Sequence, residues 1–354
     1  MGFWSEYSVF LAQTVTVVIA VIVIVGFIAA SGQRTRKDGH IEINKINDKF
    51  DDLQDQFEEV VLSKEEYKAK AKALKKEEKE KQKAAKKEAK KSKDDEKKES
   101  RGKRVFVLDF DGDINASETE TMREEISAVL MTAEPCDEIV VRLESPGGVV
   151  HGYGLAASQL DRIKKKDIPL TVCVDKVAAS GGYMMACLAD KIVSAPFAII
   201  GSIGVVAQIP NIHRLLKKND IDVELHTAGE YKRTLTMIGE NTDEGRDKFK
   251  QDLLDTHNLF KSHVSQHRPE LAIDKVANGD IWYGTEALNN GLVDQVMTSD
   301  EYLMQLADEA DVYEVSYEMK KSLQEKLGIA ASMGISRSVD RFMTKFVDSR
   351  TQIR

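Results

Sequence analysis

The pattern of apolar and polar residues divides the chain into stretches of different character. After a short flank at 1–8, residues 9–30 carry no charge and are mostly Val, Ile, Ala, Leu and Phe. Residues 31–102 are polar and end in a Lys/Glu/Ala tract without a sustained apolar stripe, which predicts a charged spacer, partly helical or disordered. Residues 103–312 alternate apolar runs with helical patterns, and residues 313–354 form a basic, amphipathic tail.

The uncharged run at 9–30 is long enough to cross the hydrocarbon core of a bilayer as a helix. A cleaved signal peptide would need a basic n-region and a shorter apolar core, whereas residues 1–8 contain no Lys or Arg. Trp4 and Tyr7 are placed to lie at a membrane interface. We therefore interpret the run as an uncleaved transmembrane anchor. The amphipathic tail is expected to contact a membrane surface, its own domain or a neighbouring subunit.

The stretch 103–312 is predicted to be an α/β domain with a largely parallel sheet, because strand and helix patterns alternate along it. The predicted strands are 105–110, 139–143, 169–174, 192–194 and 223–226. The predicted helices are 118–130, 152–164, 181–188, 211–218 and 243–267.

A candidate nucleophile, Ser180, lies in the small-residue block Val-Ala-Ala-Ser-Gly-Gly-Tyr at 177–183. No bulky neighbour covers its hydroxyl, and the glycines after it let the backbone approach a substrate closely. A helix beginning here would direct free N–H groups at a developing negative charge. Such a block is also an ordinary strand-to-helix connection, so the interpretation depends on further motifs.

Three further motifs accompany this serine. Ser-Pro-Gly-Gly at 145–148 ends a predicted strand in a turn whose N–H groups suit an oxyanion hole. Gly-Ser-Ile-Gly-Val at 201–205 is another turn between apolar runs. Gly-Glu-Tyr-Lys-Arg at 229–233 places a lysine after a predicted strand. In motif order and spacing, residues 103–312 resemble the signal peptide peptidase A family of serine–lysine membrane proteases, and within it the SohB branch.

The resemblance implies a fold and a set of roles. The fold would be the spiral of ββα units that Clp proteases and crotonases share. Ser180 would be the nucleophile, Lys232 the general base and Ser202 the residue that orients the lysine. The oxyanion hole would be formed by backbone N–H groups of Gly147 or Gly148 and of Gly181.

The lysine assignment makes independent chemical sense. A serine hydroxyl is a poor nucleophile until a neighbouring base takes its proton. A lysine accepts that proton only when it is neutral, a state that burial and a nearby positive charge favour. Outside its motif, Lys232 would be interpreted as one more solvated lysine in a chain with many.

The resemblance also implies a location and an assembly. Family members of this type are placed in the bacterial inner membrane with the catalytic domain on the periplasmic side. Here the basic residues follow the predicted span and none precedes it, so the positive-inside rule favours the cytoplasmic side. The side therefore stays open. Single-domain relatives form rings in which the lysine of one subunit serves the serine of the next, so we expect a homo-oligomer of this kind.

Other chemistry receives less support. A histidine base would come from His151 or His226, two of seven histidines. Asp109 and Asp111 stand in an acidic turn, but no metal-ligand motif is present and we expect no metal or other cofactor. The net charge of −8 and the Glu residues interleaved with the spacer lysines argue against a nucleic-acid partner.

The predicted function is a membrane-anchored serine endopeptidase that acts through an acyl-enzyme. Its substrates would be peptides, such as signal-peptide remnants, or misfolded membrane or envelope proteins. Two alternatives remain: a catalytically silent membrane scaffold that works through the charged spacer, and a crotonase-like acyl-CoA enzyme. The cysteines Cys136, Cys173 and Cys187 form no disulfide pattern, and the last two are predicted to be buried thiols.

Overall fold

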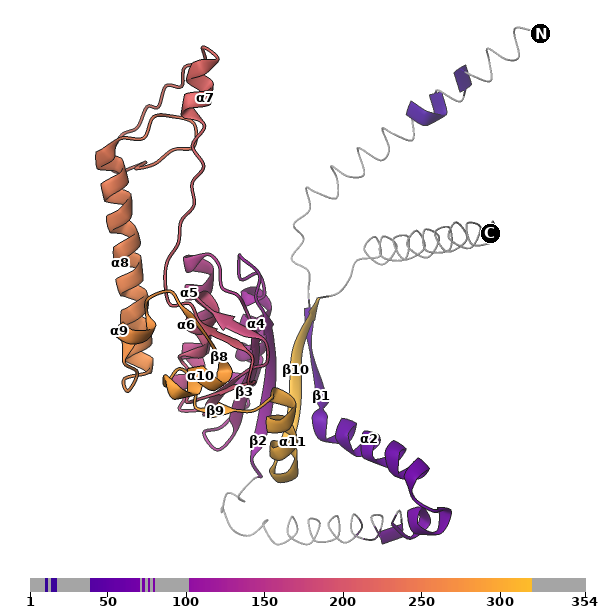
Figure 1. Ribbon diagram of the computed structural model, residues 1–354. Coiled ribbons are helices and arrows are strands. Elements are labelled where there is room, and N and C mark those ends of the chain that lie inside the picture. Colours follow the sequence, from indigo (N-terminus) through magenta and orange to yellow (C-terminus); the bar gives the residue numbers. More distant parts are fainter. Residues whose placement is uncertain are drawn as a thin grey trace, which may run out of the picture. The chain divides into compact units, whose positions relative to one another are not determined.

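The computed structural model describes residues 10–11, 14–17, 39–70, 72–73, 76, 79 and 102–319 (Figure 1). Ile41–Tyr317 form one compact unit, which contains the sheets and helices discussed below. The predicted anchor at 9–30 and tail at 313–354 lie largely outside the described residues. None of the described helices is both long and apolar enough to cross a membrane.

Two sheets organise the compact unit. The larger has seven strands in the order β1 (Gly39–Lys45), β10 (Asp311–Met319), β2 (Arg104–Asp111), β3 (Glu138–Glu144), β4 (Leu170–Val174), β6 (Lys191–Ser194) and β9 (Gln295–Val296). From β10 to β9 all neighbouring strands are parallel. The smaller has the order β5 (Val177–Ala179), β7 (Ile199–Gly201) and β8 (Ile281–Tyr283), with β5 and β7 parallel and β7 and β8 antiparallel. The chain therefore has the predicted mixed α/β fold.

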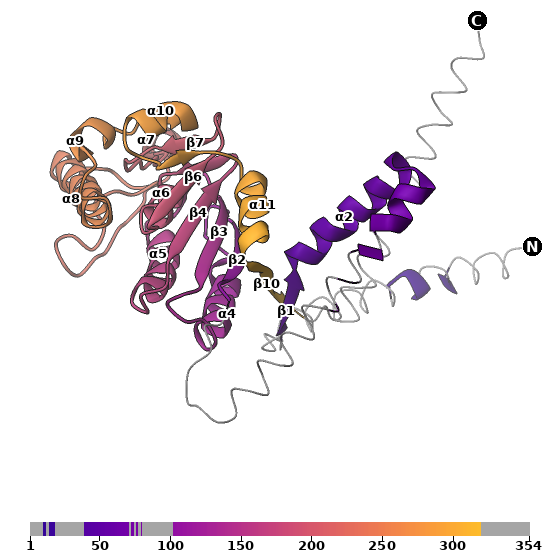
Figure 2. The ribbon, with the colours of Figure 1, turned by 90° about the horizontal axis from the view of Figure 1, so that it is seen from below.

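Both faces of the larger sheet are buried, as parallel sheets require. Phe106 and Leu108 of β2 point into one apolar cluster, and the alternate residues Val105 and Val107 point into another. Helices α4, α5 and α6 lie on the first face and α11 on the second (Figure 2). Their bounds are Thr119–Leu130, Val150–Lys164, Gly181–Ala186 and Ser299–Glu309.

The sheet extends beyond the predicted domain in both directions. Residues 39–61 of the predicted spacer form β1 and helix α2 (Ile46–Val61), and β10 continues past residue 312. The Asn47 side chain joins these parts, because its amide donates to the carbonyls of Ala307 and Ala310 and its oxygen accepts from the Val312 N–H. The start of α2 is thereby attached to the end of α11 and the start of β10.

Between β7 and helix α8 (Asp243–His267) the chain makes a long excursion, defined here as residues 205–242. It contains the short helix α7 (His213–Lys218) and no strand. The strand predicted at 223–226 is therefore wrong. Its apolar and polar residues alternate, but no neighbouring strand pairs with it, and Leu225 is exposed. Helices α9 (Ile273–Val276) and α10 (Gly284–Asn289) follow α8, and α8 packs against α6 and α9.

Glu125 of α4 is an ionisable group in the core, with only 4% of its surface exposed. Its Oε1 accepts the N–H of Tyr317 at 2.8 Å, and its Oε2 has no hydrogen-bond partner among the described residues. Burial raises the pKa of this carboxyl to about 7, with Glu118 and Asp109 adding to the shift and the Tyr317 N–H opposing it. The folded chain therefore holds a proton that the unfolded chain releases near its ordinary pKa of 4.5.

We predict that Glu125→Gln stabilises the protein at pH 8 by about 2 kcal/mol, because a raised pKa favours folding only while the group is protonated. The stability contributed by the protonated carboxyl is complete below pH 4.5 and is lost as the pH rises through 7. At pH 5 the variant and the wild type should differ little. Urea unfolding at both pH values measures the difference. Glu124→Gln, at an exposed position on the same helix, is the matched control. An equal effect of Glu125→Gln at both pH values would contradict the prediction.

Candidate active site

A cavity of about 1040 Å³ brings together most of the residues that the sequence singled out. Ser180, Ser202 and the Gly147–Gly148 turn all line it. Residues of α5 and α8 complete the lining. Motifs that are far apart in the sequence therefore share one site, because β3, β5 and β7 all end beside it.

Ser180 connects β5 to α6 in a strained backbone conformation, with φ of 51°. The N–H of Ser180 donates to the carbonyl oxygen of Gly201 at 2.7 Å. The N–H of the preceding Ala179 donates to the carbonyl oxygen of Ser145 at 3.0 Å. These bonds hold a conformation that a serine seldom adopts, a kind of strain that concentrates at functional sites. The serine is half-buried at the cavity wall.

The Gly147–Gly148 turn packs directly against the serine. A Cβ on Gly147 would lie 2.8 Å from the Ser180 Cβ and 2.7 Å from the Gly181 nitrogen, and Gly147 has φ of +85°. The N–H of Gly147 donates to the Ser145 hydroxyl at 3.1 Å. Within residues 102–319, the N–H groups of Gly148 and Gly181 have no acceptor. Of the two glycines that the sequence left open, Gly148 is the one whose N–H is available to a ligand.

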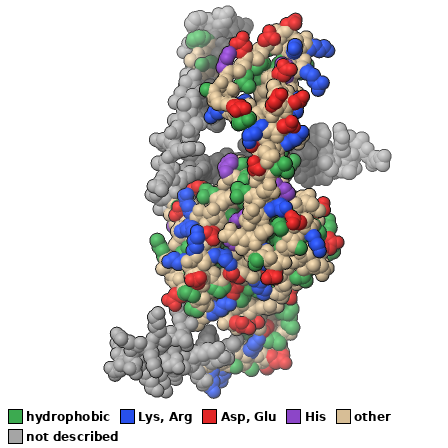
Figure 3. All heavy atoms as spheres, turned by 90° about the vertical axis from the view of Figure 1, so that its left-hand side faces the viewer, with side chains coloured by type: hydrophobic (Ala, Val, Ile, Leu, Met, Phe, Trp, Pro, Cys, Tyr) green, Lys and Arg blue, Asp and Glu red, His purple; other side chains and the backbone are tan. Residues whose placement is uncertain are grey.

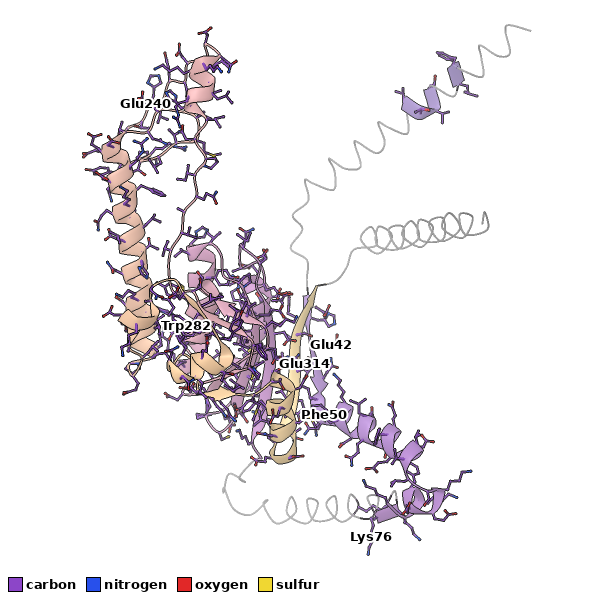
Figure 4. The ribbon with its side chains drawn as sticks, viewed as in Figure 1. Glu42, Phe50, Lys76, Glu240, Trp282 and Glu314 are labelled. Atoms are coloured by element: carbon purple, nitrogen blue, oxygen red, sulfur yellow. The ribbon has the colours of Figure 1, made fainter. Side chains whose placement is uncertain are left out.

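Ser202 lies on the neighbouring turn with φ of 50°. Its N–H donates to the Asp280 carbonyl at 2.7 Å, so β8 fixes its backbone. Gly201, with φ of +100°, leaves no space for a side chain, since a Cβ there would lie 2.8 Å from the Trp282 ring (Figure 4). No hydrogen bond of the Ser202 hydroxyl is formed within the described part of the chain.

Lys232 does not line the cavity of its own chain. It is exposed in the excursion, and its N–H donates to the Gly229 carbonyl at 3.2 Å. The adjacent Tyr231 ring packs under Lys248 of α8, 5.5 Å from its Nζ. Lys248 precedes the cavity residue His257 by nine positions, about 14 Å along a helix. The described chain thus places Lys232 outside the cavity that contains Ser180.

Neither histidine considered as an alternative base, His151 or His226, lines the cavity. Both are exposed. Three other histidines, on α8, do line it: His257, His263 and His267. No motif in the sequence marked them, since a histidine on a helix is most often a packing or surface residue. The Nε2 atoms of His257 and His263 donate to the carbonyls of Ile203 and Met184 at 3.2 and 3.0 Å, which fixes α8 to the two serine-bearing segments.

Asp109 and Asp111, which were expected in an acidic turn, lie in strand β2, and Asp109 is ion-paired. Asp109 accepts two hydrogen bonds from Arg142, which also pairs with Glu314 of β10 (Figure 4). Among the described residues, no group of three or more His, Cys, Asp or Glu side chains could hold a metal ion. Cys173 and Cys187 are buried free thiols, as predicted.

The excursion exposes many apolar side chains. On the face that carries α7 and α8, hydrophobic side chains lie among charged residues and histidines (Figure 3). The exposed apolar residues of the excursion are Val206, Ile209, Ile212, Leu215, Ile221, Leu225, Tyr231, Met237 and Ile238.

The chain matches two protein-family models. Residues 2–160 match the model described as peptidase family S49 N-terminal, and residues 162–313 match peptidase family S49. The chain is 52% identical over 342 residues to "Probable protease SohB" of Haemophilus influenzae, which covers 96% of both chains. Two proteins of the same name from Buchnera aphidicola are 56% identical over 67% of this chain and 70% of theirs, and 49% identical over 86% of each.

We predict that Gly147→Ala lowers the free energy of unfolding by at least about 2 kcal/mol, because an alanine is strained at positive φ. Its Cβ would also meet the Ala179 carbonyl oxygen at 2.7 Å. Urea unfolding measures the loss. Gly154→Ala is the matched control, since Gly154 lies in α5 with no atom within 4 Å of an added Cβ. That change should be neutral or stabilising by up to about 1 kcal/mol. Equal stabilities of the two variants would refute the packing described for the turn.

Proposed function

Since the chain belongs to peptidase family S49, we propose that it hydrolyses peptide bonds with Ser180 as the nucleophile, Lys232 as the general base and Ser202 orienting the lysine. One observation carries the proposal. Ser180 is held in a strained turn at a cavity, beside two backbone N–H groups, of Gly148 and Gly181, that have no acceptor within residues 102–319. Such a pair of donors next to a serine suits the oxyanion of acyl transfer.

The chemistry follows from these groups. The neutral Nζ of Lys232 takes the proton from the Ser180 hydroxyl as Oγ attacks the scissile carbonyl carbon. The N–H groups of Gly148 and Gly181 stabilise the negative oxygen of the tetrahedral intermediate. The protonated lysine then gives its proton to the departing amine, which leaves an ester on Ser180. A water deprotonated by the same lysine attacks this ester and releases the second product.

The cavity wall suggests the kind of peptide. Val150, Val206 and Leu259 line it with exposed apolar side chains, so it can accommodate an apolar side chain of an extended substrate. We propose that signal-peptide remnants or misfolded membrane or envelope proteins are the substrates. The uncharged run at 9–30 would anchor the enzyme to the membrane in which such segments lie. The order of strands and helices is compatible with the ββα spiral of Clp proteases and crotonases.

The position of Lys232 supports shared active sites. The lysine is exposed, lies outside its own cavity and belongs to an excursion rich in exposed apolar residues. We propose that the excursion of one subunit packs against the next and brings Lys232 to the Ser180 and Ser202 of that neighbour. A contact of this head-to-tail kind closes into a ring when it is repeated.

We predict that Ser180→Ala and Lys232→Ala each reduce kcat by at least about a thousandfold, because nucleophile and base act as one unit. Hydrolysis of fluorogenic peptides by the detergent-solubilised full chain measures the loss, and circular dichroism checks the fold. A fluorophosphonate should label Ser180 in the wild type, which would distinguish the protease from a silent scaffold or an acyl-CoA enzyme. Lys217→Ala, at an exposed lysine of the same excursion, should retain full activity. Substantial turnover by Lys232→Ala would transfer the role of base to another group.

We predict that co-expressed Ser180→Ala and Lys232→Ala subunits recover activity in mixed oligomers. If the sites lie between subunits, about a quarter of the interfaces in a random ring pair an intact serine with an intact lysine. Two different affinity tags, purified in sequence, isolate the mixed assemblies, and their turnover per complex is the measurement. Mixed assemblies without activity, beside fully active wild-type assemblies prepared in the same way, would show that each serine uses the lysine of its own chain.

A further inference from the structure

A chain of buried hydrogen bonds runs beneath the Gly147–Gly148 turn. The N–H of Gly147 donates to the Ser145 Oγ at 3.1 Å, the hydroxyls of Ser145 and Tyr153 lie 2.6 Å apart, and the Tyr153 hydroxyl donates to the Asp113 carbonyl at 2.8 Å. Ser145 and Tyr153 are both completely buried. Their hydroxyls therefore bond to the protein and not to solvent.

The two ends of this chain fix its direction. The Gly147 N–H can only donate and the Asp113 carbonyl can only accept, so Ser145 must donate to Tyr153. Hydrogen bonds aligned in one sense strengthen one another in a low-dielectric interior. Burial raises the pKa of Tyr153, and Asp113 and Asp111 add to this effect against the opposing Ser145 hydrogen bond, so the phenol keeps its proton near neutral pH.

The same two side chains also touch the segment that follows the nucleophile. A Cβ on Gly181 would lie 2.4 Å from Cγ of the Tyr153 ring, and a Cβ on Gly182 would lie 2.6 Å from the Ser145 carbonyl oxygen. On the other side, a Cβ on Gly112 would lie 2.5 Å from the Tyr153 hydroxyl. Three glycines thus leave the space that this pair fills.

The backbone of Ser145 is a further link to the nucleophile. The N–H of Ser145 donates to the carbonyl oxygen of Val177 at 2.8 Å, and its carbonyl oxygen accepts from the N–H of Ala179 at 3.0 Å. These two bonds attach the turn to β5. Ser145 is therefore bonded through its backbone to the strand that ends at Ser180, and through its side chain to the neighbouring glycine turn.

We propose that Ser145 and Tyr153 are positioning residues of the oxyanion hole. The hydrogen-bond chain fixes the Gly147–Gly148 turn so that the Gly148 N–H faces the cavity, and the Tyr153 ring supports Gly181 so that its N–H faces the same point. Neither side chain touches the reacting atoms. The inference rests on the proposed function of Ser180, and it adds the residues that set the geometry of the two donors.

The test compares Tyr153→Phe, which keeps the ring and removes the hydroxyl, with Ser145→Ala, which removes the acceptor of the Gly147 N–H. Each variant should lose about 10- to 100-fold in kcat, less than or equal to the loss of one oxyanion donor, with KM changed less than about twofold. The pH profile of kcat should keep its shape, because the general base is untouched. The double variant should lose little more than either single variant, since both act through one chain.

Inhibition by a peptide aldehyde distinguishes a positioning role of Ser145 and Tyr153 from a purely structural one, which would leave the inhibition constant unchanged. The adduct of the aldehyde with Ser180 places an oxyanion in the hole, so its inhibition constant should rise in proportion to the loss of kcat/KM. Fluorophosphonate titration of Ser180 normalises all values to active sites. Tyr302→Phe is the matched control: it removes another buried phenol hydroxyl, bonded to Glu138 at 2.7 Å on the opposite face of the sheet. This control should change stability without changing kcat per labelled serine.

If both Tyr153→Phe and Ser145→Ala keep the kcat and the aldehyde affinity of the wild type per active site, the positioning role of these two residues is wrong. The proposed peptidase function would be unaffected by that result. If one variant does not fold, the other decides by the same criterion. If the wild type neither hydrolyses peptides nor reacts with the fluorophosphonate, the proposed function fails. Hydrogen exchange of the Gly147 amide then tests the chain directly: it should be slow in the wild type and faster in Tyr153→Phe, and equal rates would overturn the inference.

Discussion

The site depends on the close approach of backbone segments around Ser180. The serine has positive φ, its N–H is bonded to Gly201, and the Gly147 turn packs against its Cβ with no space for a further carbon. The neighbouring backbone leaves no space for a side chain at Gly147 or at Gly201. Glycine is therefore required at both positions by packing as well as by the positive φ. This packing places Gly148 and Gly181 with Ser180 in the lining of one cavity.

The residues of the proposed site fall into two groups: those that the compact unit of one chain holds in place, and Lys232, which it does not. Ser180, the amides of Gly148 and Gly181 and the Ser202 turn all follow strand ends of the compact unit. Lys232 belongs to the excursion, where no strand ladder or apolar core fixes it, and the side chains around it are exposed. A base on such a segment acquires a defined position only when another surface covers the excursion, and this makes subunit contact a condition of the proposed chemistry.

The sequence was sufficient for the long elements and for the motifs that the structure brings to one cavity. The strands at 105–110, 139–143, 169–174 and 192–194 were confirmed because continuous apolar runs are typical of a buried parallel sheet. Strands β5, β7 and β8 have only three residues each and pair across long stretches of chain, so no local pattern marks them. The strand predicted at 223–226 shows the reverse error, since alternation alone does not provide a partner strand. The motifs located Ser180 and the glycine turns, but the choice of Gly148 over Gly147 required the hydrogen bond to Ser145, and Tyr153 carried no local signal.

A centre made of backbone amides has a consequence for its response to pH. Amide donors do not titrate near neutral pH, and the hydroxyls of Ser145 and Tyr153 are buried within a hydrogen-bond chain. Asp161 of α5 and the α8 histidines are the remaining ionisable residues among those that line the cavity in the described part of the chain. The Nε2 atoms of His257 and His263 donate to the carbonyls of Ile203 and Met184, which holds both rings in place. Burial and the neighbouring His263 lower the pKa of His267, so this ring stays neutral at physiological pH. The backbone donors proposed for the oxyanion hole therefore contain no group that titrates near neutral pH, so the pH dependence of the proposed reaction should arise from side chains and not from these amides.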